Sequence, residues 1–195
     1  MSLVIFDTET GGLTDRHPTI QIAAIAVDHD WIEVAAFERK LRFNREHADE
    51  KALSMNSFNA DVWGREAIDS RDALLQFADF LRDHADLTKM SQSGKKYTVA
   101  RLCGHNAAAF DLPRVSGECR QQNIFFPGDF AVLDSLQLYR WSRFINPHSE
   151  GPDSGKLGDI AKFYGISTDG AHDALADCRI VAAIAPKLLA STKGA

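Results

Sequence analysis

The sequence has few cysteines, no long apolar run and no excess of positive charge. Its cysteines, Cys103, Cys119 and Cys178, are odd in number and show no C-x-x-C spacing, which predicts neither a disulfide framework nor a zinc site. No stretch approaches the roughly 18 apolar residues of a membrane span, and the first seven residues lack the basic flank of a secretory signal. We therefore expect a cytoplasmic protein with no membrane partner.

The charge balance excludes a further class. A net charge of −5 at pH 7 argues against a broad basic surface that grips duplex DNA by charge alone. Motifs for other chemistries are also missing: no G-x-G-x-x-G follows the first predicted strand, no G-x-S-x-G is present, and Leu157 stands where a phosphate loop needs Ser or Thr. A polyanionic substrate would have to be held by something other than bulk charge.

Length and hydrophobic patterning predict one α/β domain. At 195 residues with 45% hydrophobic residues, the chain fits one ordinary core, so we expect a single domain over 1–195. Its mixed sheet should carry helices on both faces, with the strand over 98–103 parallel to the central first strand. The expected strands are 3–6, 19–27, 31–41, 98–103 and 130–133, the second and third forming a hairpin. The expected helices are 70–85, capped by Ser70, one starting near 110–112, then 134–143, 156–164 and 173–189, with loops over 89–97 and 146–155.

Acidic residues, two of them near a histidine, lie at the ends of three of these elements. Asp7 and Glu9 end the first strand two residues apart, which places both carboxylates on one face and makes a ledge for a hard metal ion. His105 and Asp111 flank a small-residue turn between a strand and a helix. His172 and Asp177 lie at the start of the last helix. Taken singly, each group is also typical of a solvated strand end, a satisfied histidine or a helix cap.

Together and in this order, the three groups resemble the DEDDh group of DnaQ-like 3′-to-5′ exonucleases, which have an RNase H-like fold. Asp-Thr-Glu-Thr-Gly-Gly-Leu at 7–13 is similar to their first motif, 105–111 to their second and 172–177 to their third, and Leu133-Asp134-Ser135-Leu136 is similar to a segment between the last two. The six-residue step from His105 to Asp111 is more like exonuclease I and Trex-type enzymes than like proofreading subunits. The resemblance implies a five-stranded mixed sheet flanked by helices.

The resemblance also implies residue roles. Asp7, Glu9, Asp111 and Asp177 would hold two Mg²⁺ or Mn²⁺ ions, and His172 would be the general base that takes a proton from the attacking water. Two such ions and hard oxygen ligands suit phosphodiester hydrolysis. Further residues would contact the terminal nucleotide: Thr8, Thr10, Gly11, Gly12, Leu13, Met55, Phe58, Asn106 and Phe110. Gly11 and Gly12 would offer backbone N–H groups, and Phe110 could equally belong to the core.

The expected function is a metal-dependent 3′-to-5′ exonuclease on single-stranded nucleic acid, DNA preferred, that releases nucleoside 5′-monophosphates. Two alternatives stay open. One is an exoribonuclease that trims RNA ends or short oligoribonucleotides, since a two-metal site does not discriminate the sugar. The other is a proofreading or adaptor module that docks to a polymerase or to a replication or repair protein, although the tail over 190–195 offers no recognisable docking segment. A homodimer is compatible with the sequence.

Overall fold

The computed structural model describes residues 2–192 and contains a five-stranded mixed sheet in the order β3-β2-β1-β6-β7. β1 is central, antiparallel to β2 and parallel to β6. This confirms the predicted mixed sheet, its hairpin and the central position of the first strand. The strands are β1 (Leu3–Thr10), β2 (Thr19–Val27), β3 (Glu33–Lys40), β6 (Arg101–Gly104) and β7 (Leu133–Asp134).

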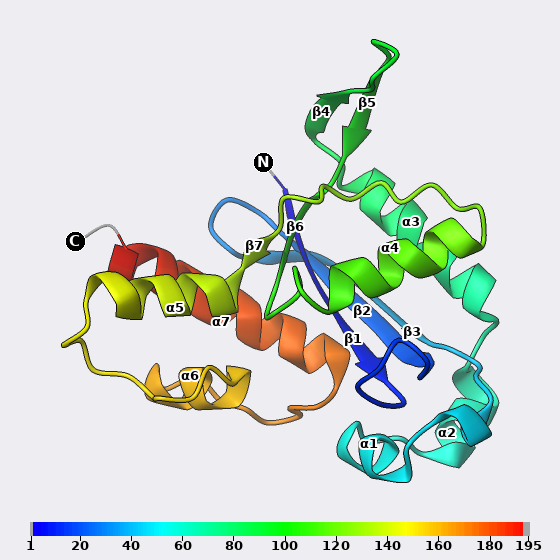
Figure 1. Ribbon diagram of the computed structural model, residues 1–195, viewed down its shortest axis with the longest axis horizontal. Coiled ribbons are helices and arrows are strands. Elements are labelled where there is room, and N and C mark those ends of the chain that lie inside the picture. Colours follow the sequence, from blue (N-terminus) through cyan, green and yellow to red (C-terminus); the bar gives the residue numbers. More distant parts are fainter. Residues whose placement is uncertain (1, 193–195) are drawn as a thin grey trace.

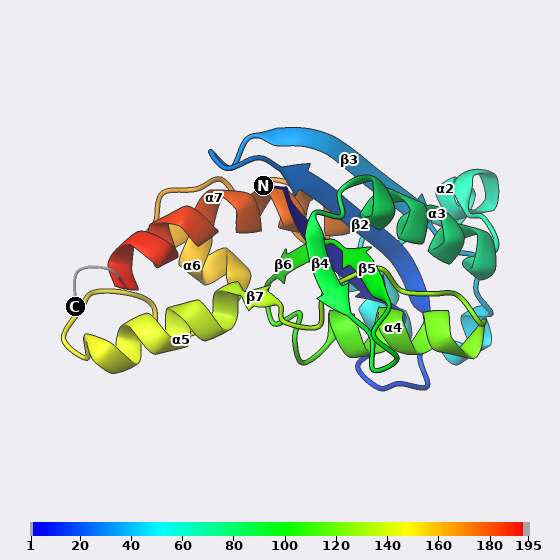
Figure 2. The ribbon, with the colours of Figure 1, turned by 90° about the horizontal axis from the view of Figure 1, so that it is seen from above.

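Helices cover both faces of the sheet (Figures 1 and 2). On one face pack α3 (Ser70–Asp83) and α4 (Asp111–Gln121); on the other packs α7 (Ala174–Thr192), with α5 (Ser135–Ile145) and α6 (Leu157–Phe163) beyond it. The sheet is apolar toward both layers: Val4 and Phe6 face α3 and α4, whereas Ile5 faces α7. This alternation is what a central strand buried on both faces requires.

Several boundaries differ from the predictions. β1 continues through Thr10, so Asp7 and Glu9 lie within the strand and not after it. The cap of α3 is Asp69, one residue before Ser70, and the last strand is limited to Leu133–Asp134. α7 runs to Thr192, beyond the predicted end at 189, and the tail residues 193–195 lie outside the described residues.

The polar stretch over 89–97 is not the loop that its composition predicts. It belongs to a two-stranded hairpin, β4 (Leu87–Met90) with β5 (Lys96–Val99), which projects from the body of the molecule (Figure 1). The predicted strand over 98–103 is accordingly split between β5 and β6. Hydrophobic periodicity misses this hairpin because its residues are largely exposed on both sides.

Short helices not predicted from the sequence fill the connection between β3 and α3. They are a 3₁₀ turn (Arg45–His47), α1 (Glu50–Met55) and α2 (Ala60–Glu66). Asn44, Asp49 and Asn59 cap their N-termini by accepting backbone hydrogen bonds. Among residues 2–192, no helix combines the length and apolar character needed to cross a membrane, and the three cysteines are buried and unpaired.

Candidate active site

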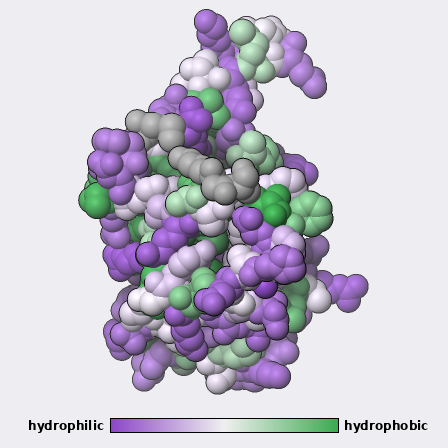
Figure 3. All heavy atoms as spheres, turned by 90° about the vertical axis from the view of Figure 1, so that its left-hand side faces the viewer, coloured by the Kyte–Doolittle hydropathy of each residue, from purple (hydrophilic) through white to green (hydrophobic). Residues whose placement is uncertain are grey.

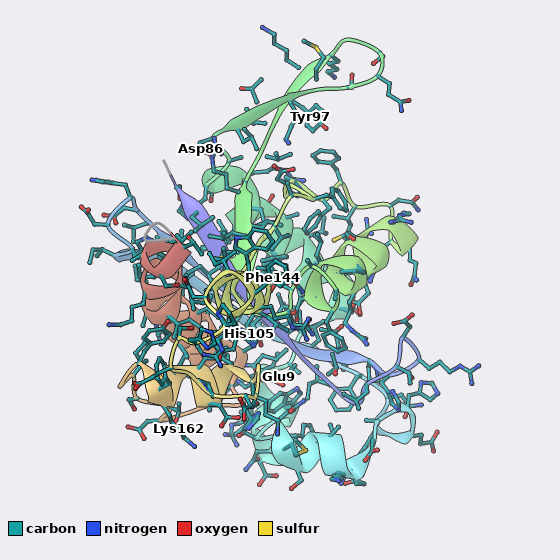
Figure 4. All side chains as sticks on the ribbon, turned by 60° about the vertical axis from the view of Figure 1, so that its left-hand side comes forward. Glu9, Asp86, Tyr97, His105, Phe144 and Lys162 are labelled. Atoms are coloured by element: carbon teal, nitrogen blue, oxygen red, sulfur yellow. The ribbon has the colours of Figure 1, made fainter. Side chains whose placement is uncertain are left out.

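Carboxylates from the two ends of the chain meet where β1 reaches α7. Oxygens of Asp7 and Glu9 on β1 and of Asp177 on α7 all lie within 4.8 Å of one another. The strand period explains the meeting, because Asp7 and Glu9 continue the face of Ile5, which packs on α7. Figure 4 shows Glu9 near the centre of this end of the molecule, between α1 and the α5–α6 side. Residues from opposite ends of the sequence are thus brought to one point by the fold.

The fourth predicted carboxylate, Asp111, enters from the opposite layer. It begins α4, and its Oδ1 accepts hydrogen bonds from the backbone N–H of Thr8 at 3.1 Å and from Thr8 Oγ1 at 2.5 Å. Thr8 lies between Asp7 and Glu9 in sequence and therefore points to the α4 side of the sheet. The side chain predicted to contact substrate is buried and holds Asp111 instead.

Burial raises the pKa of every carboxyl in this group, and like charge adds to the effect at Asp7, Glu9 and Asp177. Burial, followed by the charge of neighbouring carboxylates, raises the pKa of Asp7 well above its usual range and that of Glu9 to about 8. Burial also raises the pKa of Asp111 to about 6 against the opposing effect of Thr8. For Asp177, burial raises the pKa and His172 lowers it. The nearby positive groups, His172 beside Asp177 and Arg114 beside Asp111, do not offset the effect of burial on these pKa values.

One atom of the group has no partner within the described residues. Asp177 Oδ1 is buried and accepts no hydrogen bond, although an unsatisfied buried acceptor costs free energy. Three carboxylates in contact, with raised pKa values and one orphaned oxygen, are the donor set of a hard divalent cation. The residues present therefore fit the metal site that the sequence predicts.

A fifth carboxylate, Asp173, stands behind the cluster and raises the pKa values of Asp7, Glu9 and Asp177. Its Oδ1 caps α7 by accepting the N–H groups of Leu175 and Ala176, as its position before the helix predicts. Its Oδ2 accepts a hydrogen bond of 3.1 Å from Nε2 of Gln21, which also donates to Glu38 on β3. The sequence offers no signal for this buried amide, which joins the start of α7 to the sheet.

His172 precedes this cap on an exposed turn. Its φ of 69° lies in the left-handed region, which few residues other than glycine adopt, Asn, Asp and His more often than the rest. The turn is closed by the N–H of Asp173, which donates to the carbonyl of Gly170 at 3.2 Å. His172 lines one pocket of about 590 Å³ together with Asp177, the one carboxylate of the cluster that reaches this space.

The turn after β6 is held by one carboxylate. Asp134 accepts the N–H of Asn106 at 3.0 Å and that of Ala108 at 3.1 Å, while it caps α5 through Leu136 and Gln137. His105 is hydrogen-bonded to Ser135 and to the Gly155 carbonyl, in agreement with a structural histidine. Asn106 takes φ 61° in this turn and lines the same pocket as His172.

The glycines predicted to offer backbone N–H groups to substrate lie in a buried segment after β1. Gly11 donates its N–H to the carbonyl of Pro18 at 2.8 Å, so that group is already used within the protein. Gly11 and Gly12 are both buried. A side chain at position 11 would place its Cβ 2.8 Å from the Cβ of Ala48, and one at position 12 would place its Cβ 2.6 Å from the ring of His17. Thr10 is buried and donates to the Gly12 carbonyl. These contacts fix the conformation of the segment after β1, and contact of these residues with substrate stays a prediction.

The predicted apolar contacts divide into two sets. Leu13, 89% exposed, and Phe110, with Arg114 over its ring at 5.1 Å, line a second pocket of about 590 Å³ outside the main core. Met55 at the end of α1 is also exposed, and the next residue ties α1 to β1 through a bond to the Thr10 carbonyl. Phe58, in contrast, is half-buried and packs on Trp63 and Phe43, and contact of its ring with substrate stays a prediction.

Comparison with solved structures identifies the fold. No family model matches this sequence, and no curated protein matches it. E. coli exonuclease I in complex with a dT13 oligonucleotide is similar over 99% of this chain and 42% of its own, with a TM-score of 0.78 and 16% identity. The chain has the exonuclease I fold. This confirms the predicted RNase H-like class.

Two further exonuclease I structures agree. The zinc-bound form of the E. coli exonuclease I complex with single-stranded DNA gives a TM-score of 0.76 at 17% identity, over 99% of this chain and 43% of that one. A moderately thermophilic exonuclease I from Methylocaldum szegediense gives 0.72 at 21%, with the same coverage. The chain thus spans less than half the length of these exonuclease I structures.

Proposed function

We propose that the chain is a metal-dependent 3′-to-5′ exonuclease that hydrolyses single-stranded nucleic acid, DNA preferred, to nucleoside 5′-monophosphates, and that residues 1–195 act as one exonuclease domain. The observation that carries the proposal is the meeting of Asp7, Glu9 and Asp177 within 4.8 Å, with Asp177 Oδ1 left without a partner. The motif order in the sequence and the exonuclease I fold support the same chemistry.

In this proposal, Asp7, Glu9 and Asp177 hold divalent cations, with Asp111 beside them in the orientation that Thr8 fixes. We assign two Mg²⁺ or Mn²⁺ ions because the ligand set consists of hard oxygens. When bound, such ions supply the positive charge that draws a scissile phosphate into a cluster of carboxylates.

His172 has the separate task of moving a proton. Its imidazole accepts a proton from the attacking water, whose oxygen forms a bond to phosphorus while the bond to the 3′ oxygen breaks. The leaving 3′ oxygen takes its proton from solvent, and the phosphate remains on the released nucleoside. The exposed turn that carries His172 allows the proton to pass on to solvent.

The substrate class rests on the exonuclease I neighbours, and the compartment on the state of the cysteines. One exonuclease I neighbour holds a dT13 oligonucleotide, and we propose single-stranded 3′ ends for this chain. Stacking on apolar side chains such as the exposed Leu13 and the half-buried Phe110 would not select a base. We place the protein in the cytoplasm, in keeping with three unpaired thiols.

The test is a degradation assay on DNA and RNA single strands of the same sequence, labelled at the 5′ end, with Mg²⁺, Mn²⁺ or EDTA. A ladder that shortens from the 3′ end of DNA, and that EDTA abolishes, is the expected result. Faster shortening of RNA would favour the exoribonuclease. No ladder on either polymer would overturn the proposal and favour a module that docks to a polymerase or to another replication or repair protein.

Two variants separate the assigned roles. Asp7→Ala should abolish turnover, and retained activity in the purified variant would remove the proposed site. His172→Ala should lower the rate by roughly 10²- to 10⁴-fold, the usual contribution of a positioned general base, while cation binding persists. Loss of cation binding in His172→Ala would show that the imidazole serves the ion and not the proton.

A further inference from the structure

The pocket beside the carboxylate cluster extends away from it toward positive charge. It lies between α5, α6 and α7, and its volume is about 590 Å³. At one end are His172 and Asp177. Its remaining wall carries three exposed cationic side chains: Arg140 on α5, Lys156 before α6 and Lys162 on α6. In a chain of net charge −5, this pocket joins an anionic centre to a cationic wall.

These cations are not neutralised by the protein. Across residues 2–192, none of the three forms an ion pair or a side-chain hydrogen bond, in contrast to Lys40, Arg101 and Arg179, which are paired with carboxylates. Asp159 is the one acidic side chain of the pocket other than Asp177, so positive charge exceeds negative charge along the wall. The face formed by α5, α6 and the end of α7 is largely hydrophilic, with only separate apolar patches (Figure 3).

The position of the pocket indicates which part of a bound nucleic-acid strand would lie in it. The exposed residues proposed to contact the terminal nucleoside, Leu13 and Met55, belong to the loop after β1 and to α1. In Figure 1, α1 lies below the end of β1 and α6 lies to its left, and Lys162 stands on the α6 side in Figure 4. A strand whose terminal nucleoside lies at α1 and whose scissile phosphate sits at the carboxylates can therefore continue over the α6 side, which carries the unpaired cations.

We propose that Arg140, Lys156 and Lys162 bind the phosphates on the 5′ side of the scissile bond. The ligand is a single strand with at least two linkages, and the enzyme should prefer it to a dinucleotide. The inference rests on the proposed exonuclease function and adds to it a minimum length of strand. It also explains how an acidic protein holds a polyanion, because the contacts are local and few.

The first experiment compares strand lengths. KM and kcat are measured for dT2 and dT6 with the wild-type protein, with Arg140→Met and Lys162→Met, and with Lys187→Met as a matched control on an exposed lysine of α7 outside the pocket. Each pocket variant should raise the KM for dT6 about three- to tenfold and that for dT2 less. The dependence of log KM on log salt should also fall by about 0.7 for each phosphate that the variant no longer binds.

The second experiment locates the phosphate. A neutral methylphosphonate at the second linkage from the 3′ end of dT6 should raise the wild-type KM to a similar degree. Combined with Lys162→Met, it should add little further loss, because the two changes remove the same interaction. Inhibition by dTMP should be the same in wild type and variants, since the pocket takes an internal linkage and not the phosphate of the product.

The outcomes separate the two proposals. If wild-type protein shortens no strand, the exonuclease proposal fails. If it shortens dT6 but Arg140→Met and Lys162→Met match Lys187→Met, the pocket assignment alone is wrong. Fully additive losses in the methylphosphonate cycle, or weakened dTMP inhibition in the variants, would also overturn it. Equal thermal midpoints for all variants would exclude misfolding as the cause.

Discussion

The two halves of β1 lie in one strand and do opposite things to stability. Leu3–Phe6 is apolar, and Val4, Ile5 and Phe6 are fully buried between helices on both faces, which stabilises the fold in proportion to the area removed from water. Asp7–Thr10 continues the same alternation, but it places the carboxylates of Asp7 and Glu9 against that of Asp177, where burial and like charge oppose their ionisation. Packing of the first half on both faces therefore fixes the strand firmly enough to hold mutually repelling carboxylates at its end.

Removing apolar volume next to the first half should have the largest effect. Phe77 on α3 is fully buried, 6.2 Å from the ring of Phe6 and 5.5 Å from that of Phe37. Phe77→Ala should lower the free energy of unfolding by about 3–5 kcal/mol, measured by denaturant titration. Leu75→Ala, on the exposed side of the same helix, should cost less than about 1 kcal/mol. Equal costs would contradict the packing described.

A bound divalent cation should offset the repulsion between the carboxylates in the second half of β1 and so stabilise the fold. Mg²⁺ or Mn²⁺ at about a hundred times its dissociation constant should add about 2.7 kcal/mol to stability by mass action. The thermal midpoint should then rise by roughly 2–4 °C per kcal/mol for a chain of this size. Asp7→Asn should abolish the rise and should be more stable than wild type without metal. A midpoint insensitive to millimolar Mn²⁺ would argue against the cation site.

Protonation is a second way to remove negative charge from the carboxylates in the second half of β1. Glu9 has its pKa raised from 4.5 to about 8, so between these values the folded protein keeps a proton that the unfolded chain has released. The stability that this bound proton contributes is therefore fully present below about pH 4.5 and is lost as the pH rises through about 8. Without metal, the free energy of unfolding should fall on the order of 2 kcal/mol between about pH 5 and pH 8, and Glu9→Gln should flatten this slope. A rise with pH would contradict the assigned burial.

The smallest expected effect lies at the boundary between the halves. Thr8→Val removes the hydroxyl that donates to Asp111 and keeps the backbone N–H bond, so stability should fall by about 1 kcal/mol. Asp111 should then be less well placed, and the Mn²⁺ concentration for half-maximal activity should rise more than kcat falls. Thr8→Ser, which restores the hydroxyl, should recover the wild-type value. An unchanged metal requirement in Thr8→Val would show that the hydroxyl does not position Asp111.

Patterning predicts the parts of the molecule in which local sequence and tertiary packing agree. The apolar runs predict the central strand, the antiparallel hairpin beside it and the main helices, and the motifs predict four carboxylates and a histidine. Three of those carboxylates meet in the structure, and the fourth lies beside them. The hairpin β4–β5 and the short helices α1 and α2 escape prediction because too few of their residues are buried to create a period.

The substrate residues show a different limit. Thr8, Thr10, Gly11 and Phe58 stand at positions where a motif suggests contact with a ligand, yet their donors or faces are used within the protein. Sequence spacing reports which residues lie near the site, but hydrogen-bond partners appear only when the chain is folded. The same is true of Gln21, whose amide reaches two carboxylates from other elements.

The bonds of Asp134 have a consequence for local opening. One side chain accepts N–H groups from the turn after β6 and from the first turn of α5, whose residues are Asn106, Ala108, Leu136 and Gln137. Because all four amides share one acceptor, a movement of Asp134 breaks their hydrogen bonds together. Their hydrogen exchange should therefore follow one common opening, which would make two segments that are distant in sequence behave as one cooperative unit.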